Sequence, residues 1–122
     1  MILREYVFEW KNRNDVMVNL NITNETPMSL EAEQAVYRML QEALANIARH
    51  SHASQVDISL DFSATDLAVK VEDNGQGFDL DHKPNGIGLR TIIERAEGIG
   101  GQARVRSAPG EGTTIFIDLP LS

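Results

Sequence analysis

The spacing of apolar residues changes along the chain, and it predicts where helices and strands lie. Residues 2–11 carry apolar side chains at helical spacing, and the polar residues 12–15 are expected to break this helix. Apolar and polar positions alternate over residues 16–22, which is typical of a half-buried strand. Residues 23–27 are rich in turn formers and predict a loop.

The next segment predicts the longest helix. Residues 30–50 contain no Gly or Pro, and Ser29 is positioned to cap the N-terminus of this helix. The apolar stripe along one side of the helix consists of Val36, Leu40, Ala43 and Ile47. This stripe predicts the face that packs against the core.

The second half of the chain predicts an antiparallel hairpin. Residues 56–62 and 67–72 both alternate apolar and polar positions, and a short turn joins them. Residues 73–88 are rich in Gly, Asp and Asn, which indicates a loop. The remaining elements are expected to be a helix over 88–101 that stops at a Gly-Gly pair, and strands over 102–107 and 113–120.

This element order predicts an α+β fold. Helices and hairpins do not alternate here as they would in a doubly wound parallel sheet. We expect a two-layer α/β sandwich, in which helices cover one face of a mixed, mostly antiparallel sheet. Residues 1–122 have the length of a single domain.

Composition and charge exclude several classes of protein. The formal net charge is −7, and the 11 Lys and Arg residues are scattered, which argues against general binding to nucleic acid or to an anionic membrane. The absence of cysteine excludes a disulfide framework and thiolate metal sites, and it fits a cytoplasmic setting. No apolar run approaches the roughly 20 residues of a membrane span.

The first candidate for binding chemistry is Asp73, which begins the segment Asp-Asn-Gly-Gln-Gly-Phe. Asp73 has the same strand parity as Val69 and Val71, so its carboxylate points toward the helix-covered side if the strand persists. A buried acid there needs hydrogen-bond donors, which a ligand amino group would supply. An Asx-type turn without a ligand explains the same residues equally well. Thr113 has the parity of the inward residues of the last strand, and an ordinary strand start is again the alternative.

Glu42 and Asn46 form a second candidate group. They lie four residues apart on one flank of the long helix, where they could bind Mg²⁺ and orient a water or hydroxyl. An ordinary polar helix flank is the alternative, and spacing alone favours it. Arg49 and His50 lie one turn further on, where they could face phosphates or serve only as basic residues in a last helical turn.

Three Gly-x-Gly units are each a weak signal when taken alone. They occur at Gly75 and Gly77, at Gly86 and Gly88, and at Gly110 and Gly112. The second unit opens a helix, where backbone N–H groups can hold phosphate. A P-loop is excluded because no Gly-Lys-Ser/Thr sequence follows.

Taken together, these motifs resemble the GHKL ATPase family over about residues 16–120. The motifs are Glu42-x-x-x-Asn46, "DNGQGF", "GIGL" at a helix start and "GEGT" before the last strand, in this order. The family includes histidine kinases, gyrase-type topoisomerases, chaperones and MutL-type repair proteins, and its fold is the Bergerat-type ATP-binding sandwich. The helix sequence and the short loop between Phe78 and Gly86 resemble the nitrate-sensor subgroup of histidine kinases, with its DesK and LiaS groups.

The resemblance implies ATP and Mg²⁺ as ligands and a role for each candidate. Asp73 would accept a hydrogen bond from the adenine amino group, with Thr113 beside it. Asn46 would coordinate Mg²⁺, and Glu42 would be the catalytic base.

The remaining candidates would contact other parts of the nucleotide. Gly75 and Gly77 would allow it to approach the backbone, and residues 79–87 would form a mobile lid. Arg49 stands where the family often has Lys and would contact phosphate, and His50 matches a residue common in the subgroup. The backbone groups that would hold phosphates belong to Gly86, Ile87, Gly88 and Leu89.

The implied function is transfer of the ATP γ-phosphoryl group to a histidine on a separate dimerisation domain, with a response regulator downstream. A phosphoacceptor helix is not found in these 122 residues. We therefore expect a monomeric catalytic domain that is part of a longer, membrane-bound sensor kinase and is inactive alone. The alternatives are a standalone anti-sigma-type serine kinase, a GHKL ATPase switch module and a binding module without catalysis.

Overall fold

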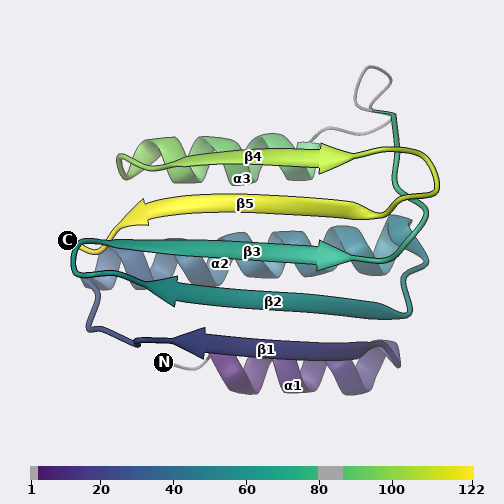
Figure 1. Ribbon diagram of the computed structural model, residues 1–122, viewed down its shortest axis with the longest axis horizontal. Helices are drawn as coiled ribbons and strands as arrows, with labels where there is room; N and C mark the ends of the chain where they lie inside the picture. Colours follow the sequence, from purple (N-terminus) through teal and green to yellow (C-terminus); the bar gives the residue numbers. More distant parts are fainter. Residues whose placement is uncertain (1–2, 80–86) are drawn as a thin grey trace.

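The structure, a computed structural model, describes residues 3–79 and 87–122, without the side chain of Ile87. Figure 1 shows how the elements follow one another along the chain. They are α1 (Leu3–Asn14), β1 (Met17–Thr23), α2 (Leu30–Asn46), the π-helical turn η1 (Ile47–Ser51), β2 (Gln55–Phe62), β3 (Asp66–Asp73), α3 (Ile87–Gly98), β4 (Gln102–Ser107) and β5 (Thr113–Pro120).

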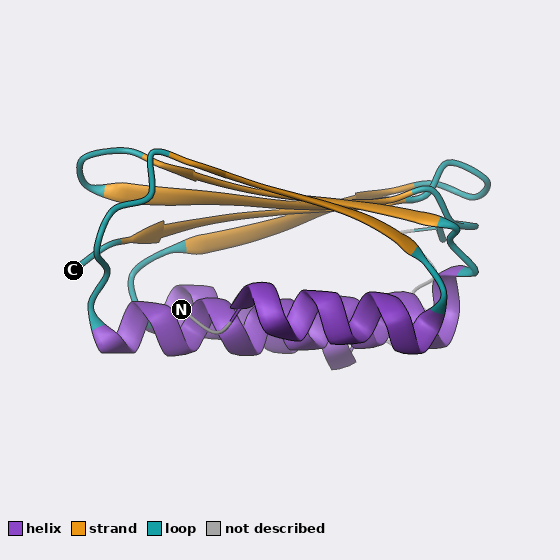
Figure 2. Cartoon of the chain, turned by 90° about the horizontal axis from the view of Figure 1, so that it is seen from below, coloured by secondary structure: helices purple, strands orange, loops and turns teal. Residues whose placement is uncertain are grey.

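The strands form one five-stranded sheet in the order β1-β2-β3-β5-β4. β1 and β2 are parallel because α2 crosses over between them, whereas the other neighbouring pairs are antiparallel. Figure 2 shows the twisted sheet as one layer and the helices as a second layer on one of its faces. The predicted α+β sandwich with a mixed, mostly antiparallel sheet is confirmed.

The core lies between the two layers, where the inward face of the sheet meets the helices. Residues at alternate strand positions are buried, as their apolar pattern predicts. The sheet contributes Val56, Ile58, Leu60, Phe62, Leu67, Val69, Val71, Ile115, Ile117 and Leu119. The helices contribute Leu3, Val7, Trp10, Val36, Met39, Leu40, Ala43, Leu44, Ile47, Leu89, Ile92 and Ala96. The predicted apolar stripe of the long helix is therefore buried throughout.

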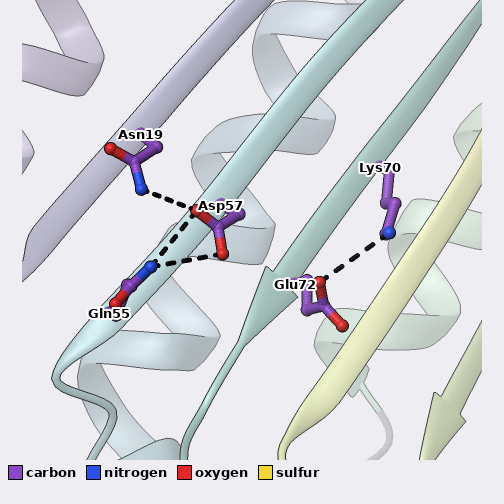
Figure 3. Close-up of polar contacts among 5 residues, drawn as sticks. All are labelled: Asn19, Gln55, Asp57, Lys70 and Glu72. Carbon is purple, nitrogen blue, oxygen red and sulfur yellow. Dashed lines mark hydrogen bonds and ion pairs between the residues drawn. The ribbon is translucent and has the colours of Figure 1, made fainter.

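The opposite face of the sheet is polar. Figure 3 shows Asp57 on β2 accepting a hydrogen bond of 2.8 Å from Asn19 on β1 and a second one from Gln55 on its own strand. On β3, Lys70 and Glu72 form an ion pair of 3.7 Å. The Asn19–Asp57 bond joins neighbouring strands, whereas the other contacts link residues two positions apart on one strand. Figure 2 shows the described helices on the opposite face of the sheet.

The first predicted helix is too short at its C-terminal end. α1 continues through residues 12–14, which were expected to break it, and Asn14 Nδ2 donates to Trp10 O at 3.0 Å. The helix ends only where Asp15 adopts a positive φ of 54°. Polar side chains do not interrupt a helix on its solvent side, and a change of backbone conformation is needed to end it.

The prediction for the long helix is correct at its start and wrong in its last turn. Ser29 Oγ accepts a hydrogen bond from Ala32 N at 3.1 Å, which confirms the expected cap. The α-helix ends at Asn46, however, and residues 47–51 form the π-helical turn η1. His52 then ends the segment in the left-handed conformation. Residues within a π-helical turn have ordinary helical composition, so the apolar spacing gave no sign of the change.

The third strand and the third helix also differ at their ends from the predictions. β3 includes Asp73, which was assigned to a loop, because Asp73 pairs with Val56 on one side and Thr113 on the other. α3 starts at Ile87 and ends at Gly98. Gly100 has a φ of 84°, and Gly101 N donates to Ala96 O at 2.8 Å, so the Gly pair ends the helix as expected. Among the described helices, none has the length and apolarity needed to cross a membrane.

Candidate functional site

A cavity of about 280 Å³ opens at one end of the sandwich. It lies where β3 ends, β5 begins and α2 passes into η1, and Figure 1 shows these ends on the same side of the molecule. The residues that line it are Asn46, Ile47, His50, Ser51, Asp73, Gln76, Gly77, Phe78, Leu89, Thr113 and Ile115. Six of the predicted site residues are among them: Asn46, His50, Asp73, Gly77, Leu89 and Thr113.

Asp73 is the buried acid of this cavity. It is the last residue of β3 and lies in phase with the buried residues of that strand, with 6% of its surface exposed. Its Oδ1 accepts a hydrogen bond of 2.8 Å from Gly75 N. Burial raises the pKa of the Asp73 carboxyl, and hydrogen bonds from the backbone N–H groups of Gly75 and Thr113 oppose this rise. Asp73 is thus both the start of an Asx-type turn and a cavity-lining carboxylate, so the two readings from sequence are not exclusive.

Thr113 is joined to a residue that the sequence reasoning missed. Ser107, the last residue of β4, places its Oγ 2.8 Å from Thr113 Oγ1. Ser107 Oγ also accepts a hydrogen bond from Phe78 N at 3.0 Å and lies 3.0 Å from Gly112 O. Ser107 therefore ties together the end of β4, the start of β5 and the loop after β3. Its strand parity with Ala103 and Val105 could have indicated it, as parity indicated Asp73.

The C-terminal part of α2 presents polar groups beside the cavity. Asn46 lines it, and Asn46 Oδ1 accepts a hydrogen bond of 3.3 Å from Arg49 Nη2. Arg49 Nη2 also lies 3.9 Å from Glu42 Oε1, with 57% and 32% of the two side chains exposed. Glu42 and Arg49 do not line the cavity but extend a polar row along the helix from Asn46. The structure thus places Arg49, which lies in η1, in contact with both members of the predicted Glu42–Asn46 pair.

Gln76 is a second residue that the sequence reasoning missed. Its side-chain Nε2 donates to His50 O at 2.5 Å, and its backbone N donates to Ser51 O at 2.7 Å. These bonds fasten the loop after β3 to η1. Gln76 lies between the two glycines in the "NGQG" segment, and an isolated Gln in a loop gives no periodic signal that could have marked it.

The glycines after β3 are required by contacts within the protein. A Cβ on Gly75 would overlap the backbone of Ser51, and a Cβ on Gly77 would overlap Ala108 O. Gly77 also has a φ of 65°, which favours glycine. Gly77 lines the cavity, whereas Gly75 does not. Their contact with a bound nucleotide stays a prediction.

The start of α3 lies against Asn46. A Cβ on Gly88 would lie 2.6 Å from the Asn46 side-chain amide, so a larger residue there would have to displace the Asn46 side chain. The first N–H groups of α3 therefore lie near the cavity wall that Asn46 and Leu89 form. Gly86 and most of the expected lid, residues 80–86, lie outside the described residues, as does the side chain of Ile87.

Within residues 3–79 and 87–122, no three His, Cys, Asp or Glu side chains are grouped to hold a metal ion. Asn46 lines the cavity with an amide side chain, and its role as a metal ligand stays a prediction.

Comparison with known proteins gives the relatives of this chain. The sensor histidine kinase LiaS of Bacillus subtilis (strain 168) is 38% identical over 120 residues, which are 98% of this chain and 33% of that protein. The signal transduction histidine-protein kinase/phosphatase DegS of Brevibacillus brevis is 34% identical over 122 residues, covering 98% of this chain and 32% of that protein. The chain spans about a third of the length of both.

Solved structures share the fold. The histidine kinase domain of the Erythrobacter litoralis EL346 blue-light activated histidine kinase matches with a TM-score of 0.75 and 23% identity, covering 98% of this chain and 59% of that chain. Acinetobacter baumannii histidine kinase AdeS matches with the same TM-score and 19% identity, covering 98% and 61%. Residues 31–122 match the family described as histidine kinase-, DNA gyrase B-, and HSP90-like ATPase, and the chain belongs to this family, as its motifs indicate.

Proposed function

We propose that this chain is the ATP-binding catalytic domain of a longer sensor histidine kinase. It binds Mg-ATP and donates the γ-phosphoryl group to a histidine on a separate dimerisation domain, from which a response regulator takes the group. Two relatives at 38% and 34% identity are named as histidine kinases, and this chain covers about a third of each, which supports one catalytic domain within a larger protein.

The observation that carries this proposal is the arrangement of opposite chemistries around one cavity. The carboxylate of Asp73 and the hydroxyl of Thr113 lie at the paired ends of β3 and β5. The wall formed by Asn46 and the N-terminal turn of α3 offers amide groups that suit an anion. The Asp73–Thr113 pair suits the amino edge of adenine, and the wall at Asn46 and the start of α3 suits the phosphates of the nucleotide.

Each part of the nucleotide then has protein groups assigned to it. Asp73 accepts a hydrogen bond from the adenine amino group, and Ile115 and Phe78 supply apolar surface to the ring. The backbone at the start of α3 holds the phosphates, with Arg49 and His50 beside them. The N–H groups assigned to the phosphates belong to Gly86, Ile87, Gly88 and Leu89.

Asn46 fits the role of Mg²⁺ ligand. Its amide oxygen is a hard oxygen donor on the cavity wall, and its one hydrogen bond among the described residues is a long contact of 3.3 Å with Arg49. When bound, Mg²⁺ neutralises negative charge on the phosphates. Asn46 positions the ion, while Arg49 is near enough to contact a phosphate oxygen with its planar guanidinium.

Glu42 carries the proton step of the transfer. A histidine nitrogen attacks the γ-phosphorus, the bond between that phosphorus and the β–γ bridging oxygen breaks, and ADP leaves. Glu42 stands one helical turn before Asn46 on an accessible flank and accepts the proton that the histidine nitrogen loses. Arg49 Nη2 lies 3.9 Å from this carboxylate and 3.3 Å from Asn46 Oδ1, so the guanidinium contacts both side chains.

The setting of the domain follows from the same proposal. Residues 1–122 act as one monomeric domain on the cytoplasmic side, where ATP and a response regulator are available. The net charge of −7 and the scattered basic residues support a domain that contacts neither nucleic acid nor the membrane surface directly.

The test is a binding and transfer experiment on the chain itself. Calorimetric titration with ATP in the presence of Mg²⁺ is expected to show a single site. The chain is then incubated with γ-³²P-ATP and a histidine-bearing dimerisation domain of a sensor kinase. An acid-labile label on that domain is expected, because a phosphorus–nitrogen bond hydrolyses in acid. An acid-stable label would indicate a serine acceptor and contradict the proposal, and absence of ATP binding would contradict it altogether.

A further inference from the structure

The hydroxyl of Ser107 contacts three polar groups next to the cavity. Its Oγ lies 3.0 Å from Phe78 N, 3.0 Å from Gly112 O and 2.8 Å from Thr113 Oγ1. A serine hydroxyl has one proton to donate, so its three contacts cannot all use that proton. The direction of each hydrogen bond can therefore be worked out.

Two of the three directions are fixed by the chemistry of the partners. Phe78 N is a donor, so Ser107 Oγ accepts from it. Gly112 O is an acceptor on a buried residue, and no other hydrogen bond to this oxygen is present among the described residues. Leaving a buried carbonyl unpaired is unfavourable, so the Ser107 proton goes to Gly112 O.

The third direction follows from the first two. Because the Ser107 proton is committed to Gly112, the 2.8 Å contact with Thr113 must use the proton of the Thr113 hydroxyl. Thr113 Oγ1 then has only lone pairs left for the cavity. Asp73, its partner in the β3–β5 ladder, is a carboxylate and also has only lone pairs to offer.

We propose that Ser107 is a specificity-determining positioning residue, which holds the Thr113 hydroxyl as an acceptor so that this end of the cavity selects a purine with an exocyclic amino group. The inference rests on the proposed function, since it refines which base the ATP site takes. A base with a carbonyl at the same edge would place an acceptor against the Asp73 carboxylate and Thr113 Oγ1, which are both acceptors, so it would bind more weakly. Ser107 acts through Thr113 and does not line the cavity itself.

The experiment compares ATP with ITP, in which a carbonyl replaces the amino group. Affinities of the chain for both are measured by displacement of a fluorescent ATP analogue. Ser107→Ala frees the Thr113 hydroxyl to turn and donate to the carbonyl, so the preference for ATP over ITP is expected to fall by about tenfold. Ser107→Thr keeps a hydroxyl and is expected to retain the preference. Ser59→Ala, a serine on the polar face of the sheet, is the matched control and leaves it unchanged.

A purely structural role for Ser107 predicts a different result. Ser107→Ala would then weaken both nucleotides equally, and an unchanged preference would overturn the inference. Thermal unfolding shows whether that variant folds. If it does not fold, Thr113→Val provides the test. Removal of an acceptor at this position is expected to lower the affinity for ATP more than the affinity for ITP. A larger loss of ITP affinity would show that Thr113 donates and would overturn the inference. Failure of the wild-type chain to bind ATP would overturn the proposed function as well, while ATP binding with unchanged preference in both variants overturns this inference alone.

Discussion

Asp73 and Thr113 are direct partners across the β3–β5 ladder, and both side chains line the same cavity. The last residue of β3 and the first residue of its neighbour in the sheet, β5, therefore present their polar groups side by side. The neighbouring inward positions on both strands, Val71 and Ile115, are buried and apolar. A polar pair thus takes the place of an apolar pair at the end of the ladder, next to Ile115, which also lines the cavity.

Replacement of Asp73 by Asn is expected to weaken ATP binding by about tenfold or more. The amide has one acceptor oxygen, and the Gly75 N–H occupies it, so the amide NH₂ would face the amino group of the base. Calorimetric titration with ATP measures the effect. Asp57→Asn is the control, since Asp57 is a hydrogen-bonded aspartate on the polar face of the sheet. Equal affinities of the Asp73 variant and the wild type would contradict the assignment.

The same variant is expected to change how stability depends on pH. Burial raises the pKa of Asp73 above its unfolded value, so its contribution to stability is fully present below the unfolded pKa and is lost as the pH rises through the folded pKa. At pH 7 Asp73→Asn should therefore have the larger free energy of unfolding. The difference should shrink as the pH falls toward the ordinary aspartate pKa of about 4.

Urea unfolding at the two pH values measures this difference, with Asp57→Asn again as the control for loss of an aspartate charge. A difference between wild type and Asp73→Asn that does not change with pH would show that the burial of the carboxyl has no such effect. Loss of ATP affinity together with a gain in stability would mark Asp73 as a residue retained for binding.

Gly88→Ala is expected to lower the Mg²⁺-dependent part of ATP affinity by about tenfold. The added Cβ would lie 2.6 Å from the Asn46 amide and displace that side chain from the cavity wall. Titrations with ATP in the presence and absence of Mg²⁺ separate the metal-dependent part. The control is Gly98→Ala in the same helix, where a Cβ meets nothing within 4 Å. Gly98→Ala is expected to bind Mg-ATP like the wild type. If Gly88→Ala does so too, Asn46 is not the metal ligand.

Glu42→Gln is expected to reduce phosphotransfer to the dimerisation domain by about 100-fold while ATP affinity stays unchanged. The variant keeps the shape of the side chain and removes its ability to accept a proton. Its partner Arg49 is more than half exposed, so folding stability should change little. Glu94→Gln, which breaks the exposed pair with Arg90, is the control. A parallel loss of ATP affinity would move Glu42 from the transfer step to nucleotide binding.

The sequence predicted most of the fold because alternation and helical spacing report burial directly. The strand patterns of residues 56–62 and 67–72 led to the observed hairpin, and the stripe from Val36 to Ile47 led to the buried face of α2. Element ends were less accurate. Asp15 and His52 end their helical segments through left-handed backbone conformations, which no apolar periodicity reports.

The candidate site divides in the same way. Parity placed Asp73 and Thr113 on the inward face of the sheet, and helical spacing placed Glu42 and Asn46 on one flank of α2. Those inferences need only the local geometry of one element. Neither spacing nor parity could show that Gln76 fastens a loop to η1, since its partners are 26 and 25 residues away along the chain and are backbone groups.

The sequence by itself determined which side chains share a face, because side-chain direction repeats with the period of each helix or strand. The tertiary structure alone decided that these faces meet around one cavity, that Gly88 brings α3 against Asn46, and that Ser107 bonds to Thr113. Such contacts join segments whose relative position depends on the packing of the whole core. A local pattern carries no information about that packing, and the direction of the Thr113 hydroxyl follows from it.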